Sequence, residues 1–131
     1  KAYMSTMQAT IASRNLKTLD SKYERIDEIR NKYNSEFGLE NTSRHLYRIK
    51  VQDNIDAMSY FKDKGIITGI HYKPQHDNLV FSNFNDGAKN LEKVKLASKQ
   101  TVSIPLHHNL TDEHIEYIIT EVKDLYNWMN M

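Results

Sequence analysis

The chain has 131 residues, of which 27% are charged, and its formal net charge is +1. This length suits one domain with a modest core, and we expect a single domain spanning residues 1–131. Acidic and basic residues are interleaved without a basic cluster, which argues against nucleic acid as a partner. No apolar run approaches the roughly 20 residues of a membrane span, so no membrane partner is expected. The absence of cysteine excludes disulfides and thiolate metal sites.

The N-terminal third of the chain has the periodicity of a helix. Between residues 16 and 37, apolar residues recur at steps of three and four with charged residues between them. This spacing predicts an amphipathic helix that ends near Gly38. Met7 and Ile11 extend the pattern upstream, so we expect one long N-terminal helix that begins close to Ser5.

Three short segments have the composition of β-strands. The segment His45–Val51 (HLYRIKV) alternates apolar and polar residues and is rich in aromatic and β-branched side chains. Residues 66–70 (IITGI) are predicted to form a second strand, and residues 101–104 (TVSI) a third, which Pro105 closes.

Helices are predicted between and after these strands. Asp53 is the expected N-cap of a short helix that ends at Gly65. Residues 73–85 are predicted to form a long loop, and residues 86–98 a weaker helix. The last helix has the clearest signals, with Thr111 as its N-cap, acidic residues in its first turn and a continuous apolar stripe. This order predicts an α+β domain, in which helices pack on a small antiparallel-type sheet of about three strands.

Six histidines raise the question of a metal site. His71 and His76 are five residues apart and His107 and His108 are adjacent, and neither spacing matches a zinc-binding motif. No metal site is therefore expected. The glycines are isolated and no nucleophile motif is present, so the residues offer no complete catalytic set and no catalytic residue is assigned.

His71 and Tyr72 are distinguished by their position. They lie at the end of a predicted strand and at the edge of a loop, where side chains project from a rigid scaffold. An imidazole and a phenol both donate and accept hydrogen bonds, which suits the hydroxyls of a sugar or a phosphate oxygen. The alternative is that both side chains cap the strand and pack the loop, and their position does not decide between these interpretations.

Four segments, taken in order, carry a family resemblance. They are AYMSTMQATIASRNLKTLDSKYERIDEIRNKYNSEF, HLYRIKV, GIITGIHYKPQH and SIPLHHNLTDEHIEYII. They resemble the DegT/DnrJ/StrS family of pyridoxal-phosphate-dependent nucleotide-sugar aminotransferases and cover nearly the whole chain. Thr10 replaces a usual alanine, and the loop after His76 lacks the family's Gln-Pro-x-Tyr pattern, so the resemblance leaves the nucleotide sugar open.

The resemblance implies that the chain is the small C-terminal domain of a fold type I enzyme, with a large domain upstream that carries the Schiff-base lysine. It implies that His71 and Tyr72 line the pocket for a nucleotide-sugar substrate, with His76 as a less constant member. Lys1 would end a turn that reaches the cofactor phosphate or nucleotide sugar of the neighbouring subunit in a homodimer.

The complete enzyme would transfer an amino group from glutamate to a keto-deoxysugar nucleotide in the bacterial cytoplasm. The pathway implied is the synthesis of lipopolysaccharide, another surface glycan or an antibiotic sugar. The isolated chain is expected to be inactive and to bind pyridoxal phosphate poorly. Two alternatives stay open: a pyridoxamine-phosphate-dependent sugar dehydratase of the same family, and a non-catalytic α+β binding or interaction module.

Overall fold

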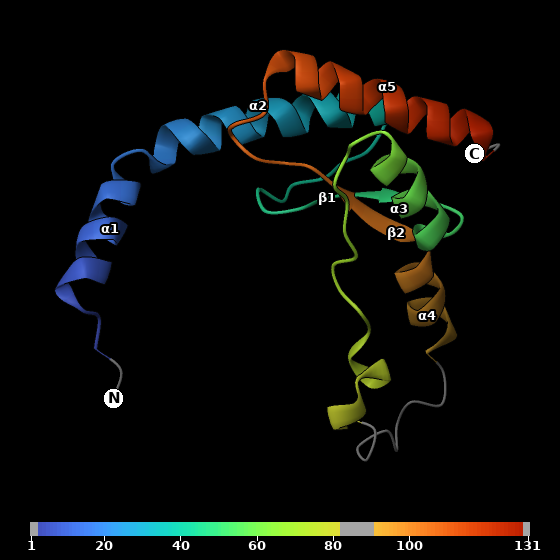
Figure 1. Ribbon diagram of the computed structural model, residues 1–131, viewed down its shortest axis with the longest axis horizontal. Helices are drawn as coiled ribbons and strands as arrows, with labels where there is room; N and C mark the ends of the chain where they lie inside the picture. Colours follow the sequence, from blue (N-terminus) through green and yellow to red (C-terminus); the bar gives the residue numbers. More distant parts are fainter. Residues whose placement is uncertain (1–2, 82–90, 130–131) are drawn as a thin grey trace.

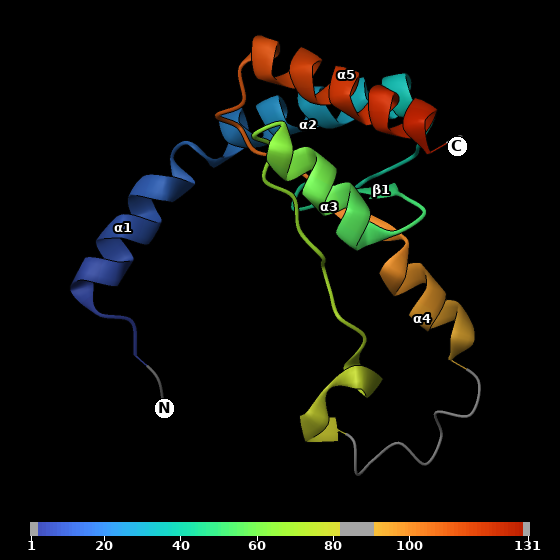
Figure 2. The same cartoon turned by 45° about the vertical axis from the view of Figure 1, so that its right-hand side comes forward.

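The computed structural model describes residues 3–81 and 91–129. Its elements are α1 (Thr6–Leu16), α2 (Leu19–Phe37), β1 (Tyr47–Lys50), α3 (Asn54–Asp63), a 3-10 helix (Gln75–Asp77), α4 (Glu92–Lys99), β2 (Thr101–Ile104) and α5 (Asp112–Trp128). α2 and α5 lie side by side over β1, β2 and α3, whereas α1 stands apart from them (Figures 1 and 2). Within the described residues, no helix is both long and apolar enough to cross a membrane.

The expected α+β class is confirmed, with a two-stranded antiparallel sheet. In its register Tyr47 lies opposite Ile104, and Arg48 lies opposite Ser103. Alternate side chains of β1 are buried and exposed, as the period of a strand requires. The inner face of the sheet therefore joins the core, and the outer face carries polar side chains.

The predicted third strand at residues 66–70 does not form, so the prediction of about three strands was wrong. Gly69 makes an isolated bridge, in which its N–H donates to Ser103 O at 3.1 Å and its carbonyl oxygen accepts from Ser103 N at 2.8 Å. The N–H of Ile66 instead donates to Phe61 O at 2.8 Å and closes the C-terminus of α3. The apolar run reflects burial of Ile66, whereas Ile67 is 89% exposed.

The predicted single N-terminal helix is two helices. α1 begins after Ser5, whose hydroxyl accepts from Gln8 N while the Gln8 side chain accepts from Ser5 N. The helix breaks at Thr18, which has φ −114° and ψ 9°, and the Thr18 hydroxyl donates to Asn15 O at 3.2 Å. The backbone N–H of Thr18 also donates to Asn15 O, at 3.2 Å, so α1 ends in a tightened turn at this position.

The core lies between α2, α3, α5 and the inner face of the sheet. The apolar stripe predicted for the last helix is confirmed, and Thr111 caps it by accepting from His114 N at 3.2 Å. Asp53 caps α3 as predicted, by accepting from Ile55 N at 2.8 Å. The largest fully buried side chains are Tyr33, Tyr47, Phe61, Ile29, Ile49, Ile115, Leu125, Val51, Val102 and Val122.

The connection between Gly69 and α4 is only partly described. Residues 73–81 lack a strand, in agreement with the predicted loop, and residues 82–85 lie outside the described part. The helix predicted over residues 86–98 is present as α4 (Glu92–Lys99). Residues 86–90 of that prediction lie outside the described residues.

Candidate functional site

The segment after Gly69 leaves the sheet and carries His71 and Tyr72. Their rings meet edge to face, with centroids 5.3 Å apart and planes at 87°. His71 is half-buried, whereas Tyr72 is 69% exposed. The predicted pair therefore lies together at the surface, at the edge of the scaffold.

His71 and Tyr72 line a cleft of about 200 Å³ between this segment and α4. Arg48 of β1 lines the same cleft, as do Ser98 of α4 and Thr101 of β2. The cleft thus offers an imidazole, a phenol, a guanidinium and hydroxyls, a set that donates hydrogen bonds to hydroxyls and to anionic oxygens.

The other two residues expected at the site are placed differently. His76 lies on the 3-10 helix, with its Nε2 3.6 Å from Oδ1 of Asp77, and it is not among the residues that line the His71 cleft. Lys1 lies outside the described residues. The structure therefore brings together two of the four residues expected to bind substrate or cofactor.

The imidazole of His71 rests against Gly69. A Cβ atom added at Gly69 would lie 2.7 Å from Cε1 of His71 and 3.4 Å from each ring nitrogen. The 2.7 Å distance is shorter than real Cβ contacts, so the observed position of the ring requires that residue 69 has no side chain. Gly69 is therefore a part of the site that the sequence pattern did not indicate.

A second pocket, of about 350 Å³, lies on the other side of His71 and is also lined by Ser103. Nδ1 of His71 and Oγ of Ser103 are buried and have no hydrogen-bond partner among the described residues. Sequence reasoning missed Ser103 and Arg48. The alternation of inward- and outward-facing side chains along β1 and β2 was the signal that could have placed Arg48 and Ser103 on one face of the sheet.

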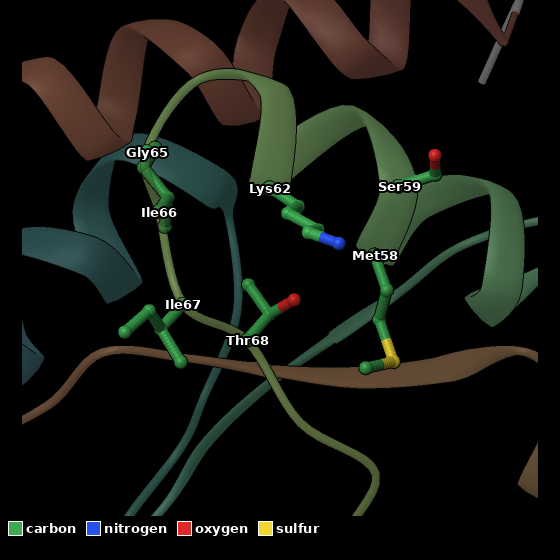
Figure 3. Close-up of a pocket in the computed structure, with 7 residues that line it drawn as sticks. All are labelled: Met58, Ser59, Lys62, Gly65, Ile66, Ile67 and Thr68. Carbon is green, nitrogen blue, oxygen red and sulfur yellow. The ribbon is translucent and has the colours of Figure 1, made fainter.

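A larger pocket, of about 540 Å³, lies between α3 and residues 65–68 (Figure 3). Figure 3 shows the side chains of Met58, Lys62 and Thr68 around this space. Of the described residues that line it, Lys62 is the one with a charge, and neither a carboxylate nor an imidazole accompanies it. This pocket therefore lacks an acid–base pair.

No metal centre is formed by residues 3–81 and 91–129, where no group of three or more His, Asp or Glu side chains could hold an ion. The tyrosines of the core are also unsuited to chemistry near neutral pH. Burial raises the pKa of Tyr47 to about 12, and the Tyr47 hydroxyl donates to Oδ1 of Asn34 at 2.9 Å.

A sequence model of the DegT/DnrJ/EryC1/StrS aminotransferase family matches residues 1–123. The chain belongs to this family. The resemblance predicted from the four segments is therefore confirmed.

Solved structures of aminotransferases share the fold of this family member. Putative sugar aminotransferase Spr1654 from Streptococcus pneumoniae, in its apo form, matches with a TM-score of 0.86 and 23% identity, over 99% of this chain and 37% of that one. Spr1654 has also been solved in forms with PMP and with PLP. Aminotransferase TlmJ from Streptoalloteichus hindustanus matches with a TM-score of 0.77 and 26% identity, over 92% of this chain and 36% of that one.

A curated relative is the "Pleiotropic regulatory protein" of Geobacillus stearothermophilus. It is 25% identical over 83 residues, which are 63% of this chain and 22% of that protein. The chain thus spans about a third of the length of the solved structures it matches and less of this relative.

The described residues do not by themselves fit pyridoxal phosphate. None of the three pockets described above combines a lysine with a carboxylate, because Lys62 is alone in its pocket and the two pockets beside His71 contain neither group. A cofactor of this kind needs a lysine for its aldehyde and a carboxylate for its pyridine nitrogen. Both would have to come from elsewhere in the protein.

Proposed function

We propose that residues 1–131 are the small C-terminal domain of a pyridoxal-phosphate-dependent nucleotide-sugar aminotransferase. The match of the family model over residues 1–123 carries this proposal. A further part of the protein, not contained in this chain, would hold the cofactor and its lysine. The complete protein would act as a homodimer in the cytoplasm.

The role of this domain would be to form one wall of the substrate pocket. His71 and Tyr72 would hydrogen-bond a sugar hydroxyl or a phosphate oxygen of the nucleotide sugar. Their place at the edge of a cleft supports this role, since a packed cap would not leave Tyr72 exposed. His76 and Lys1 enter the proposal through the family resemblance alone.

The reaction proposed for the complete protein is amino transfer from glutamate to a keto-deoxysugar nucleotide, yielding 2-oxoglutarate and the amino sugar. Bound pyridoxal phosphate would supply the electron sink for this exchange. The residues of this chain would orient the sugar and exclude water from it. The product would serve lipopolysaccharide, another surface glycan or an antibiotic.

The test is an assay of the complete protein with pyridoxal phosphate, L-glutamate and a nucleotide keto-sugar. We expect 2-oxoglutarate and amino sugar in equal amounts, and no turnover by residues 1–131 alone. Loss of water from the sugar without amino transfer would instead identify a dehydratase. A complete protein that neither binds the cofactor nor reacts would contradict the proposal in favour of a binding module.

A further inference from the structure

The outer face of the β1–β2 sheet combines cations with hydroxyls. Arg48 lies opposite Ser103, and Lys50 lies opposite Thr101. Residues directly opposite in an antiparallel pair project to the same face, and so do residues two apart along a strand. These four residues therefore share one face, and none of the four is a carboxylate.

Arg48 differs from other arginines of the chain in its pairing. Arg25, Arg30 and Arg44 each lie 2.6–2.7 Å from an aspartate oxygen. Arg48 and Lys50, in contrast, have no ion pair with any described carboxylate. Two neighbouring cations without a counter-charge favour the binding of an anion.

Ser103 lies in the middle of a row that crosses this face. Arg48 is its partner on one side, and Gly69 is its bridge partner on the other. The imidazole of His71 occupies the space where a side chain of Gly69 would be. The row therefore consists of a guanidinium, a hydroxyl and an imidazole.

Two polar atoms in this row have no hydrogen-bond partner within the part of the chain that the structure describes. Ser103 is 4% exposed, and its Oγ and the Nδ1 of His71 are buried without a hydrogen bond. Leaving one such atom unpaired costs free energy, and two in one row indicate a place that a polar ligand completes. Both residues line the pocket of about 350 Å³, and His71 and Arg48 line the adjoining cleft of about 200 Å³.

We propose that Arg48, Ser103 and His71 form a binding site for a phosphate-class oxyanion, with Lys50 at its edge. A guanidinium binds phosphate through two parallel hydrogen bonds, and a hydroxyl and an imidazole add further donors. The proposal deepens the proposed function: it rests on that function for the source of the anion, the diphosphate of the nucleotide sugar. A carboxylate of the amino donor has related chemistry, and the experiment separates the two.

The experiment measures dissociation constants of the complete protein by calorimetry, with uridine diphosphate, thymidine diphosphate and L-glutamate as probes. Arg48→Met keeps the length of the side chain and removes its charge. We expect it to weaken the binding of at least one nucleoside diphosphate by roughly 10- to 100-fold, the usual loss for a charge-assisted hydrogen bond. Arg14→Met, on the exposed surface of α1, is the matched control and should bind as wild type.

Ser103→Ala gives an independent readout, because it removes a buried hydroxyl that has no hydrogen-bond partner among residues 3–81 and 91–129. A purely structural Ser103 leaves the dissociation constants unchanged after this substitution. We expect the melting temperature to stay the same or rise, while nucleoside diphosphate binding weakens roughly 3- to 10-fold. Weaker binding without a loss of stability assigns the hydroxyl to the ligand.

Each other outcome overturns the proposal. The proposed site is refuted if Arg48→Met binds both diphosphates with the dissociation constants of wild type. It is also refuted if the wild-type protein binds neither diphosphate. If Arg48→Met weakens the binding of glutamate alone, the ligand of the site is a carboxylate and not a phosphate. Amino transfer with unaffected diphosphate binding refutes this inference and leaves the proposed function standing. If Arg48→Met weakens diphosphate binding but the wild-type protein transfers no amino group, this inference stands and the proposed function is refuted.

Discussion

The Tyr60 hydroxyl donates a hydrogen bond of 2.8 Å to Oε2 of Glu121, a residue of α5 that is 6% exposed. Nζ of Lys64 lies 3.1 Å from the same oxygen. Tyr60 lies in α3 and Lys64 is the C-cap residue of α3, so these contacts link α3 to α5. Burial acts to raise the pKa of Glu121, but the hydrogen bonds from Tyr60 and Lys64 outweigh it, and the pKa is held below its ordinary value.

Glu121→Gln should lower the free energy of unfolding near neutral pH. It should also make the free energy of unfolding depend less on pH in the acidic range. Because the pKa is lowered on folding, the carboxylate contributes stability above its ordinary pKa of 4.5 and loses it as the pH falls through the folded-state value. We expect a loss of about 1–3 kcal/mol at neutral pH, the cost of weakening hydrogen bonds to a buried charge. Urea unfolding at a series of pH values measures both effects.

Glu113→Gln is the matched control for this prediction, because Glu113 is an exposed carboxylate in the first turn of the same helix. It should leave the free energy of unfolding within about 0.5 kcal/mol of wild type. Identical acid profiles for Glu121→Gln and wild type would show that Glu121 contributes nothing through its charge.

Gly69→Ala should displace the imidazole of His71. The added methyl group would lie 2.7 Å from Cε1, and the end of a side chain can move aside, so we expect a stability cost of only about 1 kcal/mol. Binding of the nucleotide sugar should weaken as it does in His71→Ala. A double-mutant cycle checks this: in a His71→Ala background, Gly69→Ala should have no further effect on binding. Full additivity of the two losses would contradict the contact.

His71→Ala and Tyr72→Phe, in the complete enzyme, test whether the two side chains bind substrate or pack the loop. As pocket residues they should leave the free energy of unfolding within about 0.5 kcal/mol of wild type. Each should lower kcat/KM for the nucleotide sugar, by an amount that corresponds to roughly 1–3 kcal/mol of lost transition-state stabilisation. The half-reaction with glutamate should change less. Early melting with normal sugar kinetics would instead establish a packing role.

The exposed apolar side chains of α1 and of Met4 just before it should cause the isolated chain to associate with itself. Met4, Met7 and Ile11 are 56–74% exposed, and no residue of α1 is buried. Contiguous apolar surface of this kind marks an interaction site. Sedimentation should show concentration-dependent oligomers that Met7→Lys combined with Ile11→Lys removes. Ile55→Lys, at an exposed isoleucine of α3, should not, and a strict monomer in wild type would refute the prediction.

The sequence alone determined the elements whose signals are local. Thr111 and Asp53 cap their helices because each has a side-chain oxygen next to the first turn, and the stripe of α5 follows from its own periodicity. The break at Thr18 was also local, but the apolar period on both sides concealed it. His71 and Tyr72 could be singled out because a strand-like run ends beside them.

Only the tertiary structure decided what surrounds His71. Ser103 is 32 positions from it along the chain and Arg48 is 23, and pairing between β1, β2 and Gly69 is what sets them in one row. The same contacts decided that residues 66–70 form one bridge and no strand. An apolar pattern records which side chains avoid water, whereas the partner of a backbone N–H is chosen by the whole fold: α3 takes that of Ile66, and β2 takes that of Gly69.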